Sequence, residues 1–162
     1  MKVRFKKLSD SAVLPSYSKP GDAGLDLTAT TRTYNKNGDY IEYGTDLAVE
    51  IPDGYVGLVF PRSSTTTKNI ILGNSVAVVD SGYRGEIKCR FKILSDYDEV
   101  IGFSDDLIEY IDDKFSGNSK IFNIGDRVAQ LVILPYPRIE VEEASELSET
   151  ERGSGGFGST GK

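Results

Sequence analysis

A chain of 162 residues in which 38% are hydrophobic can bury one core, so we expect a single compact domain. Its formal net charge of −6 disfavours a protein that binds duplex nucleic acid, because such a protein needs a basic surface. The sequence has no histidine, which excludes a Ser-His-Asp triad and any metal site built from histidines. A general base is therefore a carboxylate or, failing that, a Lys, Tyr or Cys side chain.

Most of the chain has the pattern of short strands with tight turns. In chain order, we expect strands over residues 2–8, 39–51, 55–60, 70–72, 76–79 and 86–94, and two stretches within 121–135 on either side of Gly125 and Asp126. The sequence Gly73-Asn74 predicts a hairpin turn between two of them. Short strands with little helix favour an all-β sandwich, barrel or jelly roll.

Three segments depart from this pattern. Residues 95–120 form an acidic stretch, within which helix-like spacing predicts one short helix from about Ser104 to Phe115. Residues 141–151 are an acidic connector, and residues 152–162 are nearly all Gly, Ser and Thr around one Phe. We expect this last arm to be flexible, because it cannot bury enough apolar surface to order itself.

The location of the protein is predicted from three absences. No apolar run approaches the roughly 20 residues of a membrane-spanning helix, and residues 1–8 lack the apolar stretch of a secretory signal. The single cysteine, Cys89, cannot form an internal disulfide. We therefore expect no membrane association and a cytoplasmic location, in the cytoplasm of the host if the gene belongs to a phage.

The sequence Pro61-Arg62-Ser63-Ser64 follows an apolar strand. A planar guanidinium beside two hydroxyls can hold a phosphate group through charged and neutral hydrogen bonds. Taken alone, a solvated turn with an incidental arginine is the favoured explanation of these four residues, because short motifs often match by chance.

Asp80 also follows an apolar strand, and Tyr83 comes three residues later. A carboxylate at a rigid strand end can deprotonate a water or bind a sugar hydroxyl, and a nearby aromatic ring can cover a flat substrate face. The alternative is an ordinary Asp in a turn beside a Tyr that only packs. Gln130 is a third candidate, because it interrupts an otherwise apolar strand and a buried amide needs partners.

The C-terminal sequence from Gly156 to Lys162 fits the spacing of a Walker A loop. That interpretation fails because a Walker A loop follows a strand, opens a helix and has Ser or Thr after its lysine. A disordered tail is the plain alternative. However, glycine backbone N–H groups can wrap phosphates while the ring of Phe157 stacks on a base, and Arg152 lies just upstream.

Taken in order, these stretches resemble the five motifs of the trimeric dUTPase family, and the match spans nearly the whole chain. The matching stretches cover residues 20–27, 61–64, 73–85, 125–131 and 152–159. The resemblance implies a distorted jelly roll of the β-clip type, covering residues 1–140, and a homotrimer with active sites at its subunit interfaces. It also implies Mg²⁺-dependent hydrolysis of dUTP to dUMP and pyrophosphate, which limits uracil incorporation into DNA and supplies dUMP for dTMP synthesis.

The resemblance assigns roles to individual residues. Asp80 would bind the 3′-hydroxyl and act as, or orient, the base for the attacking water. Tyr83 would pack beneath the deoxyribose and exclude a 2′-hydroxyl, and Asp26 would meet Mg²⁺ through water. The full set implied to contact substrate is Arg62, Ser63, Ser64, Asn74, Val78, Val79, Tyr83, Lys88, Gln130, Arg152, Phe157, Gly158, Ser159 and Thr160.

Within that set, each part of the nucleotide has its own contacts. The turn around Asn74 would read uracil, and Lys88 would touch the nucleoside through its backbone. Arg62, both serines and Gln130 would hold the α- and β-phosphates. The arm would hold the γ-phosphate through Arg152, Ser159 and Thr160 and stack Phe157 over uracil.

Three features depart from the family pattern and leave alternatives open. Ser64 and Ala77 stand where the family commonly has Gly, and residues 95–120 lengthen the spacing between Asp80 and Gln130. That insert is a candidate surface for a protein partner. The alternatives are a dCTP deaminase of the same fold, a regulator without activity, and a plain β-sandwich binding module.

Overall fold

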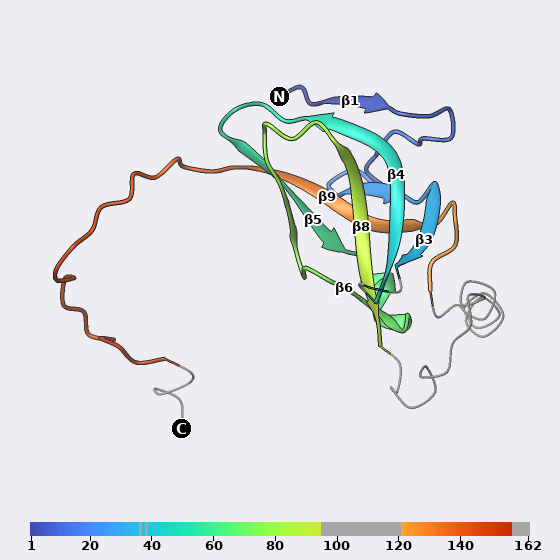
Figure 1. The fold of residues 1–162 in the computed structure, drawn as a ribbon. Coiled ribbons are helices and arrows are strands. Elements are labelled where there is room, and N and C mark those ends of the chain that lie inside the picture. The colour runs from blue at the N-terminus through green and yellow to red at the C-terminus, as the bar shows by residue number, and fades with distance from the viewer. Residues whose placement is uncertain (36, 38, 95–120, 157–162) are drawn as a thin grey trace.

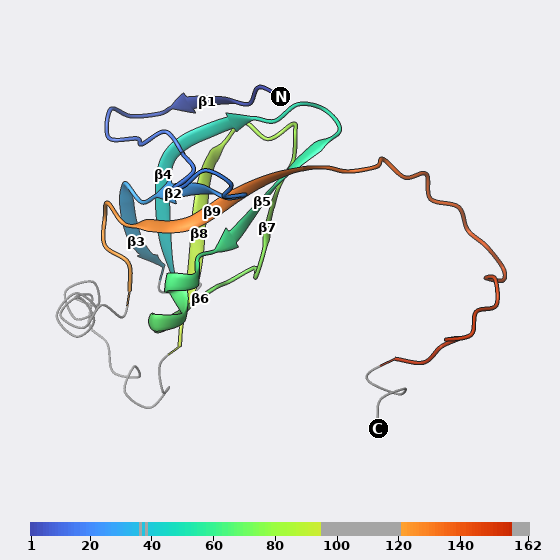
Figure 2. The same ribbon diagram turned by 180° about the vertical axis from the view of Figure 1, so that it is seen from behind.

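The structure is a computed structural model that describes residues 1–35, 37, 39–94 and 121–156. These residues form two antiparallel sheets that pack against one another, with one short 3₁₀ helix, η1 (Figures 1 and 2). The elements are β1 (Arg4–Lys7), β2 (Leu25–Thr28), β3 (Thr31–Asn35), β4 (Tyr40–Glu50), β5 (Tyr55–Pro61), η1 (Ser63–Thr67), β6 (Ile70–Leu72), β7 (Ala77–Val79), β8 (Glu86–Ile93) and β9 (Arg127–Pro135). The expected all-β jelly-roll architecture is confirmed.

The chain passes repeatedly between the two sheets. The five-stranded sheet has the order β1-β4-β8-β6, with β3 also paired to β4, and the four-stranded sheet has the order β2-β9-β5-β7. Strands that are neighbours in sequence, such as β4 and β5, therefore lie in different layers. Residues distant in sequence come together along β5 and β9.

The core between the sheets includes one face of β8, along which burial alternates strictly. Ile87, Cys89 and Phe91 are buried while Lys88 and Arg90 between them are exposed, as the period of two predicts. Tyr43 of β4 and Phe91 pack edge to face, with ring centroids 5.7 Å apart. Burial also raises the pKa of the Cys89 thiol to about 12, so Cys89 acts as a core residue.

The predicted hairpin at Gly73-Asn74 is wrong, although both of its strands exist. β6 pairs with β8 in one sheet and β7 pairs with β5 in the other, so the turn carries the chain between the layers. Ser75 reverses the chain with a φ of 58°, and the N–H of Gly73 bonds to the carbonyl of Arg90. β6 and β7 are each only three residues long, and a hairpin made of two such strands alone would be only marginally stable. Each pairs instead with a longer strand of its own sheet.

The second departure lies before β9. Two strands were expected within 121–135, but only β9 forms, and the residues before it are irregular. Ile121 and Phe122 are nevertheless buried, because the Tyr43 hydroxyl donates to the Phe122 carbonyl at 3.0 Å and accepts from its N–H at 3.2 Å. A side chain satisfies the backbone groups that a neighbouring strand would otherwise satisfy.

After β9 the chain leaves the body of the molecule as an extended segment that leads to the C-terminal arm (Figure 1). No helix or strand is present from residue 136 to residue 156. The helix expected from about Ser104 to Phe115 lies outside the described residues. Among the described residues, no helix has the length and apolar character needed to cross a membrane.

Candidate active site

A pocket of about 560 Å³ lies beside β7, the turn that follows it and the outward face of β8. This volume falls within the range of roughly 300 to 1,000 Å³ that is usual for pockets holding small ligands. The sequence-predicted residues that line it are Asn74, Val78, Val79, Asp80, Tyr83 and Lys88. The structure thus brings these six predicted residues together in one cavity.

Asp80 is positioned by β7 and by a tight turn. Val79 is buried at the end of β7 and the next residue, Asp80, is exposed, so its carboxylate stands at a strand end beside the pocket. The N–H of Tyr83 donates to the Asp80 carbonyl at 3.0 Å and closes the turn. A carboxylate fixed at such a turn can accept a proton from a water or a sugar hydroxyl.

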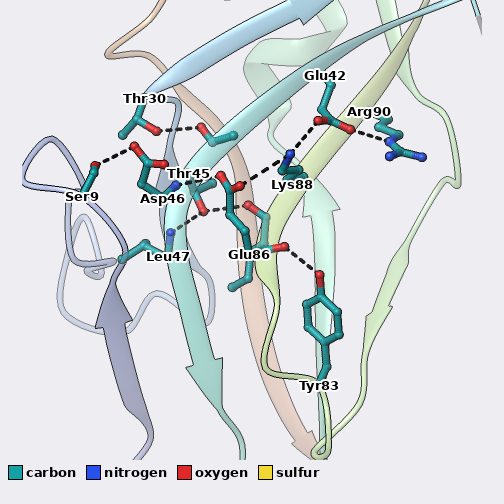
Figure 3. A network of polar contacts seen from close by, with 12 residues as sticks. Ser9, Thr30, Glu42, Thr45, Asp46, Leu47, Tyr83, Glu86, Lys88 and Arg90 are labelled. Carbon is teal, nitrogen blue, oxygen red and sulfur yellow. Dashed lines mark hydrogen bonds and ion pairs between the residues drawn. The ribbon is translucent and has the colours of Figure 1, made fainter. Parts of the chain in front are cut away.

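Tyr83 lines the same pocket, and a hydrogen bond fixes its hydroxyl group. Its hydroxyl donates to the carbonyl of Glu86 at 2.9 Å (Figure 3), while the residue as a whole is 46% exposed. The ring is therefore anchored at its far end and presents a face to the cavity. An aromatic face of this kind can pack against a sugar.

Two cations of β8 stand on the pocket rim and share one carboxylate from β4 (Figure 3). Lys88 Nζ donates to Glu42 Oε1 at 2.9 Å, and Arg90 Nε donates to Glu42 Oε2 at 2.8 Å. Burial would raise the pKa of Glu42, but the hydrogen bonds and charges of Lys88 and Arg90 outweigh it and lower that pKa. Sequence reasoning missed Glu42, since only the strand register places it opposite Arg90.

A second cluster of charged residues surrounds Asp26 on β2. Arg62 Nε donates to Asp26 Oδ1 at 2.7 Å, and Arg127 Nη1 donates to Asp26 Oδ2 at 3.0 Å. The Ser18 hydroxyl also donates to Asp26 Oδ2, at 2.7 Å. Arg127 and Ser18 were not singled out from the sequence, because nothing local to either residue indicates that it lies beside Asp26.

The charge balance of this cluster favours anions. Burial would raise the pKa of Asp26, but the hydrogen bond from Ser18 and the charge and hydrogen bonds of the two arginines lower it overall. Two arginines against one carboxylate leave a net positive charge. Because Asp26 holds Arg62 by Nε, the guanidinium is fixed in orientation, and Arg62 Nη1 lies 3.5 Å from Ser64 Oγ.

Gln130 and the two serines belong to this second cluster. Gln130 of β9 pairs across the sheet with Asp26 and with Phe60, and its Nε2 donates to the Pro61 carbonyl at 3.1 Å. Ser63 and Ser64 begin η1 directly after Arg62. The structure therefore gathers the residues that the sequence assigned to the α- and β-phosphates.

Within one chain, Asp80 and the cluster around Asp26 lie level with opposite ends of β5. Val79 pairs with Gly57, so Asp80 continues to the level of Val56, whereas Arg62 follows the last residue of the strand. Six residues of extended chain span about 20 Å. One chain therefore does not bring Asp80 and Arg62 to the same point.

The remaining predicted residues lie on the arm. Arg152 donates from Nε to the Gly155 carbonyl at 3.0 Å and is exposed. Phe157, Gly158, Ser159 and Thr160 lie outside the described residues. Among the residues that the structure does describe, no three Asp, Glu or Cys side chains gather as metal ligands.

The sequence model described as dUTPase matches residues 10–101 and 115–161. The chain belongs to the dUTPase family. The deoxyuridine 5′-triphosphate nucleotidohydrolase of Nautilia profundicola is 38% identical, with all of each chain covered. That of a Hydrogenobaculum species is 36% identical, with 99% of each chain covered.

Solved dUTPase structures share the fold. The dUTPase of Staphylococcus bacteriophage 80alpha, solved with dUPNHPP, has a TM-score of 0.76 and 28% identity over 99% of each chain. A dUTPase mutant from phage phi11 of S. aureus, described with a structural Mg(II) ion, has a TM-score of 0.67 and 24% identity over 90% of this chain and 98% of its own. The dUTPase family and fold expected from the sequence are confirmed.

Proposed function

We propose that this chain hydrolyses dUTP to dUMP and pyrophosphate through attack of a water on the α-phosphorus. The observation that carries this proposal is the pocket beside β7 in a member of the dUTPase family. It gathers Asp80, Tyr83 and Asn74 around a volume suited to a nucleoside. Asp80 would hold the 3′-hydroxyl and activate or orient the water, and Tyr83 would pack beneath the deoxyribose.

The cluster around Asp26 fits the phosphates. Arg62, oriented by Asp26, would bind phosphate oxygens through its remaining N–H groups, with Ser63, Ser64 and Gln130 as neutral partners. Such fixed donors stabilise charge that develops on the phosphate during attack, and this electrostatic effect is commonly the largest part of catalysis.

We propose further that the active site forms between subunits of a homotrimer. Asp80, which follows β7, and Arg62, which follows β5, lie level with opposite ends of β5, and this supports the proposal because a second chain would have to supply one of the two. The segment between β9 and the arm is consistent with this proposal. Ile139, Val141 and Leu147 are 75%, 86% and 89% exposed in the single chain, and packing against a neighbouring subunit would bury them.

Magnesium fits this site only together with the substrate. Both Asp26 oxygens already accept hydrogen bonds from Ser18 and two arginines, so a direct metal bond would compete with them. A hydrated Mg²⁺ that enters on the triphosphate could instead meet Asp26 through water. When bound, Mg²⁺ would neutralise phosphate charge.

The activity is tested by measuring pyrophosphate release from dUTP, UTP, dTTP and dCTP, with and without Mg²⁺. We expect rapid release from dUTP only, and loss of activity when Mg²⁺ is chelated. Release from dTTP at the same rate as from dUTP would contradict the proposal. Ammonia formed from dCTP would instead indicate a dCTP deaminase of the same fold.

A further inference from the structure

We propose that Gly85 is a positioning residue for substrate selection, because its missing side chain allows the ring of Tyr83 to lie where it can face the sugar. This inference rests on the proposed function and deepens it. It assigns the discrimination between a deoxyribonucleotide and a ribonucleotide to a pair of residues rather than to Tyr83 alone.

The ring of Tyr83 occupies the space that a side chain at Gly85 would need. A Cβ atom built on Gly85 would lie 2.6 Å from Cζ and 2.9 Å from Cε2 of Tyr83, and closer still to the hydroxyl oxygen. Carbon atoms in contact are normally about 3.5 to 4.0 Å apart. The outer half of the ring therefore rests directly on the backbone at Gly85, and any larger residue there forces the ring away.

The backbone beneath the ring is held more firmly than the ring. Glu86 begins β8 and pairs with Ala48 of β4, and its carboxylate accepts from the N–H of Asp46 at 3.0 Å (Figure 3). The same carboxylate lies 3.6 Å from Lys88 Nζ. Tyr83, by contrast, is 46% exposed and is held at its tip by one hydrogen bond, to the Glu86 carbonyl.

A methyl group at Gly85 would therefore displace the ring and leave the strand in place. The hydroxyl of Tyr83 would lose its bond to the Glu86 carbonyl, and the ring would swing outward into solvent. The sugar would then meet an open space where the ring had excluded a 2′-hydroxyl. Selection against UTP would weaken, since steric exclusion depends on the position of the ring.

The experiment compares kcat/KM for dUTP and UTP in Gly85→Ala and in a matched control, Gly82→Ala. Both glycines lie in the segment between β7 and β8, and neither has a positive φ. A Cβ at Gly82 would meet nothing within 4 Å. We expect the ratio of the two kcat/KM values to fall about tenfold in Gly85→Ala and to stay unchanged in Gly82→Ala. An unchanged ratio in Gly85→Ala would overturn the proposal.

The same substitution in a Tyr83→Ala background shows whether Gly85 acts through the ring. Without the ring, the added methyl has nothing to displace, so Gly85→Ala should leave the already lowered ratio unchanged. A further fall of similar size in that background would overturn the proposal, because Gly85 would then act independently of Tyr83.

Melting temperatures test the packing without any activity. If Gly85→Ala lowers the melting temperature more than Gly82→Ala does, the Tyr83→Ala background should abolish that difference. If Gly85→Ala lowers the melting temperature by the same amount in the Tyr83→Ala background, the backbone, and not Tyr83, excludes the methyl group. A chain that folds but does not hydrolyse dUTP would refute the proposed function. The melting temperatures would still show whether the ring of Tyr83 packs on Gly85.

Discussion

At the scale of single residues, the charged groups of the site are arranged mainly to hold one another in place. Asp26 fixes Arg62 and Arg127, and Glu42 fixes Lys88 and Arg90. Asp26 of β2 holds one cation at the start of the neighbouring strand β9 and one just after β5, and Glu42 of β4 holds two cations on the neighbouring strand β8. The orientation that results is available before substrate arrives, which is what electrostatic catalysis requires.

The lowered pKa of Asp26 predicts a specific loss of stability in acid. A carboxyl whose folded pKa lies below its ordinary value of 3.8 stabilises the fold at higher pH, and this contribution disappears as the pH falls through the folded pKa. Asp26→Asn should therefore cost about 1 to 2 kcal/mol at neutral pH. The difference from the unsubstituted chain should shrink below pH 3.8.

Thermal melts of both proteins across the acid range measure this difference. Glu149→Gln in the exposed connector is the control and should show no such pH-dependent difference. A destabilisation by Asp26→Asn that stays constant down to the acid unfolding transition would contradict the assignment, since it would reflect packing rather than the ionised carboxylate.

At the scale of elements, local patterns predicted most strands, although not β2 or β3, and predicted the strand partners poorly. β8 was predictable because Ile87, Cys89 and Phe91 alternate with charged residues, and alternation is the direct signature of a half-buried strand. The hairpin at Gly73-Asn74 was wrong, because a turn signal specifies a chain reversal and not the strand that each arm will pair with.

The predicted sites show the same limit. The residues predicted to contact the nucleoside and the phosphates were recognisable from motifs, yet Glu42 and Arg127 were not singled out. Arg127 reaches Asp26 from 101 positions away in sequence, so only the pairing of β2 with β9 brings them together. Contacts of this kind are decided by topology, which one sequence does not display.

The arm is the element whose loss should separate activity from folding. No residue after Ile133 belongs to the buried core or packs against it among the described residues. Truncation after Glu151 should therefore leave the melting temperature unchanged, while kcat for dUTP falls at least about tenfold because the site is no longer closed over its substrate. Pyrophosphate release and thermal melts of the truncated and full chains measure the two effects. Full activity in the truncated chain would remove the arm from catalysis.

At the scale of the whole molecule, the distance between Asp80 and Arg62 makes a shared active site the central expectation. Asp80 lies level with Val56 of β5 and Arg62 follows Pro61, so the two positions are six residues, or about 20 Å, apart along the strand. A water held by Asp80 cannot attack a phosphate held by Arg62 of the same chain over that distance. We therefore propose that the two groups meet across an interface between copies of the chain.

Mixing two inactive variants tests this arrangement. Asp80→Asn and Arg62→Ala should each lower kcat by about a hundredfold or more, the first by removing the base and the second by removing charge stabilisation. If each site takes Asp80 from one chain and Arg62 from another, trimers formed at random from equal amounts regain both groups in about a quarter of their sites.

Co-refolding the two variants should therefore restore activity to about a quarter of the unsubstituted level, since random assembly pairs intact groups with that frequency. Each variant refolded alone is the control and should stay inactive. A site built within one chain predicts no recovery at all, because every chain in the mixture lacks one of the two groups. Recovery of activity therefore separates a site shared between two chains from a site within one chain.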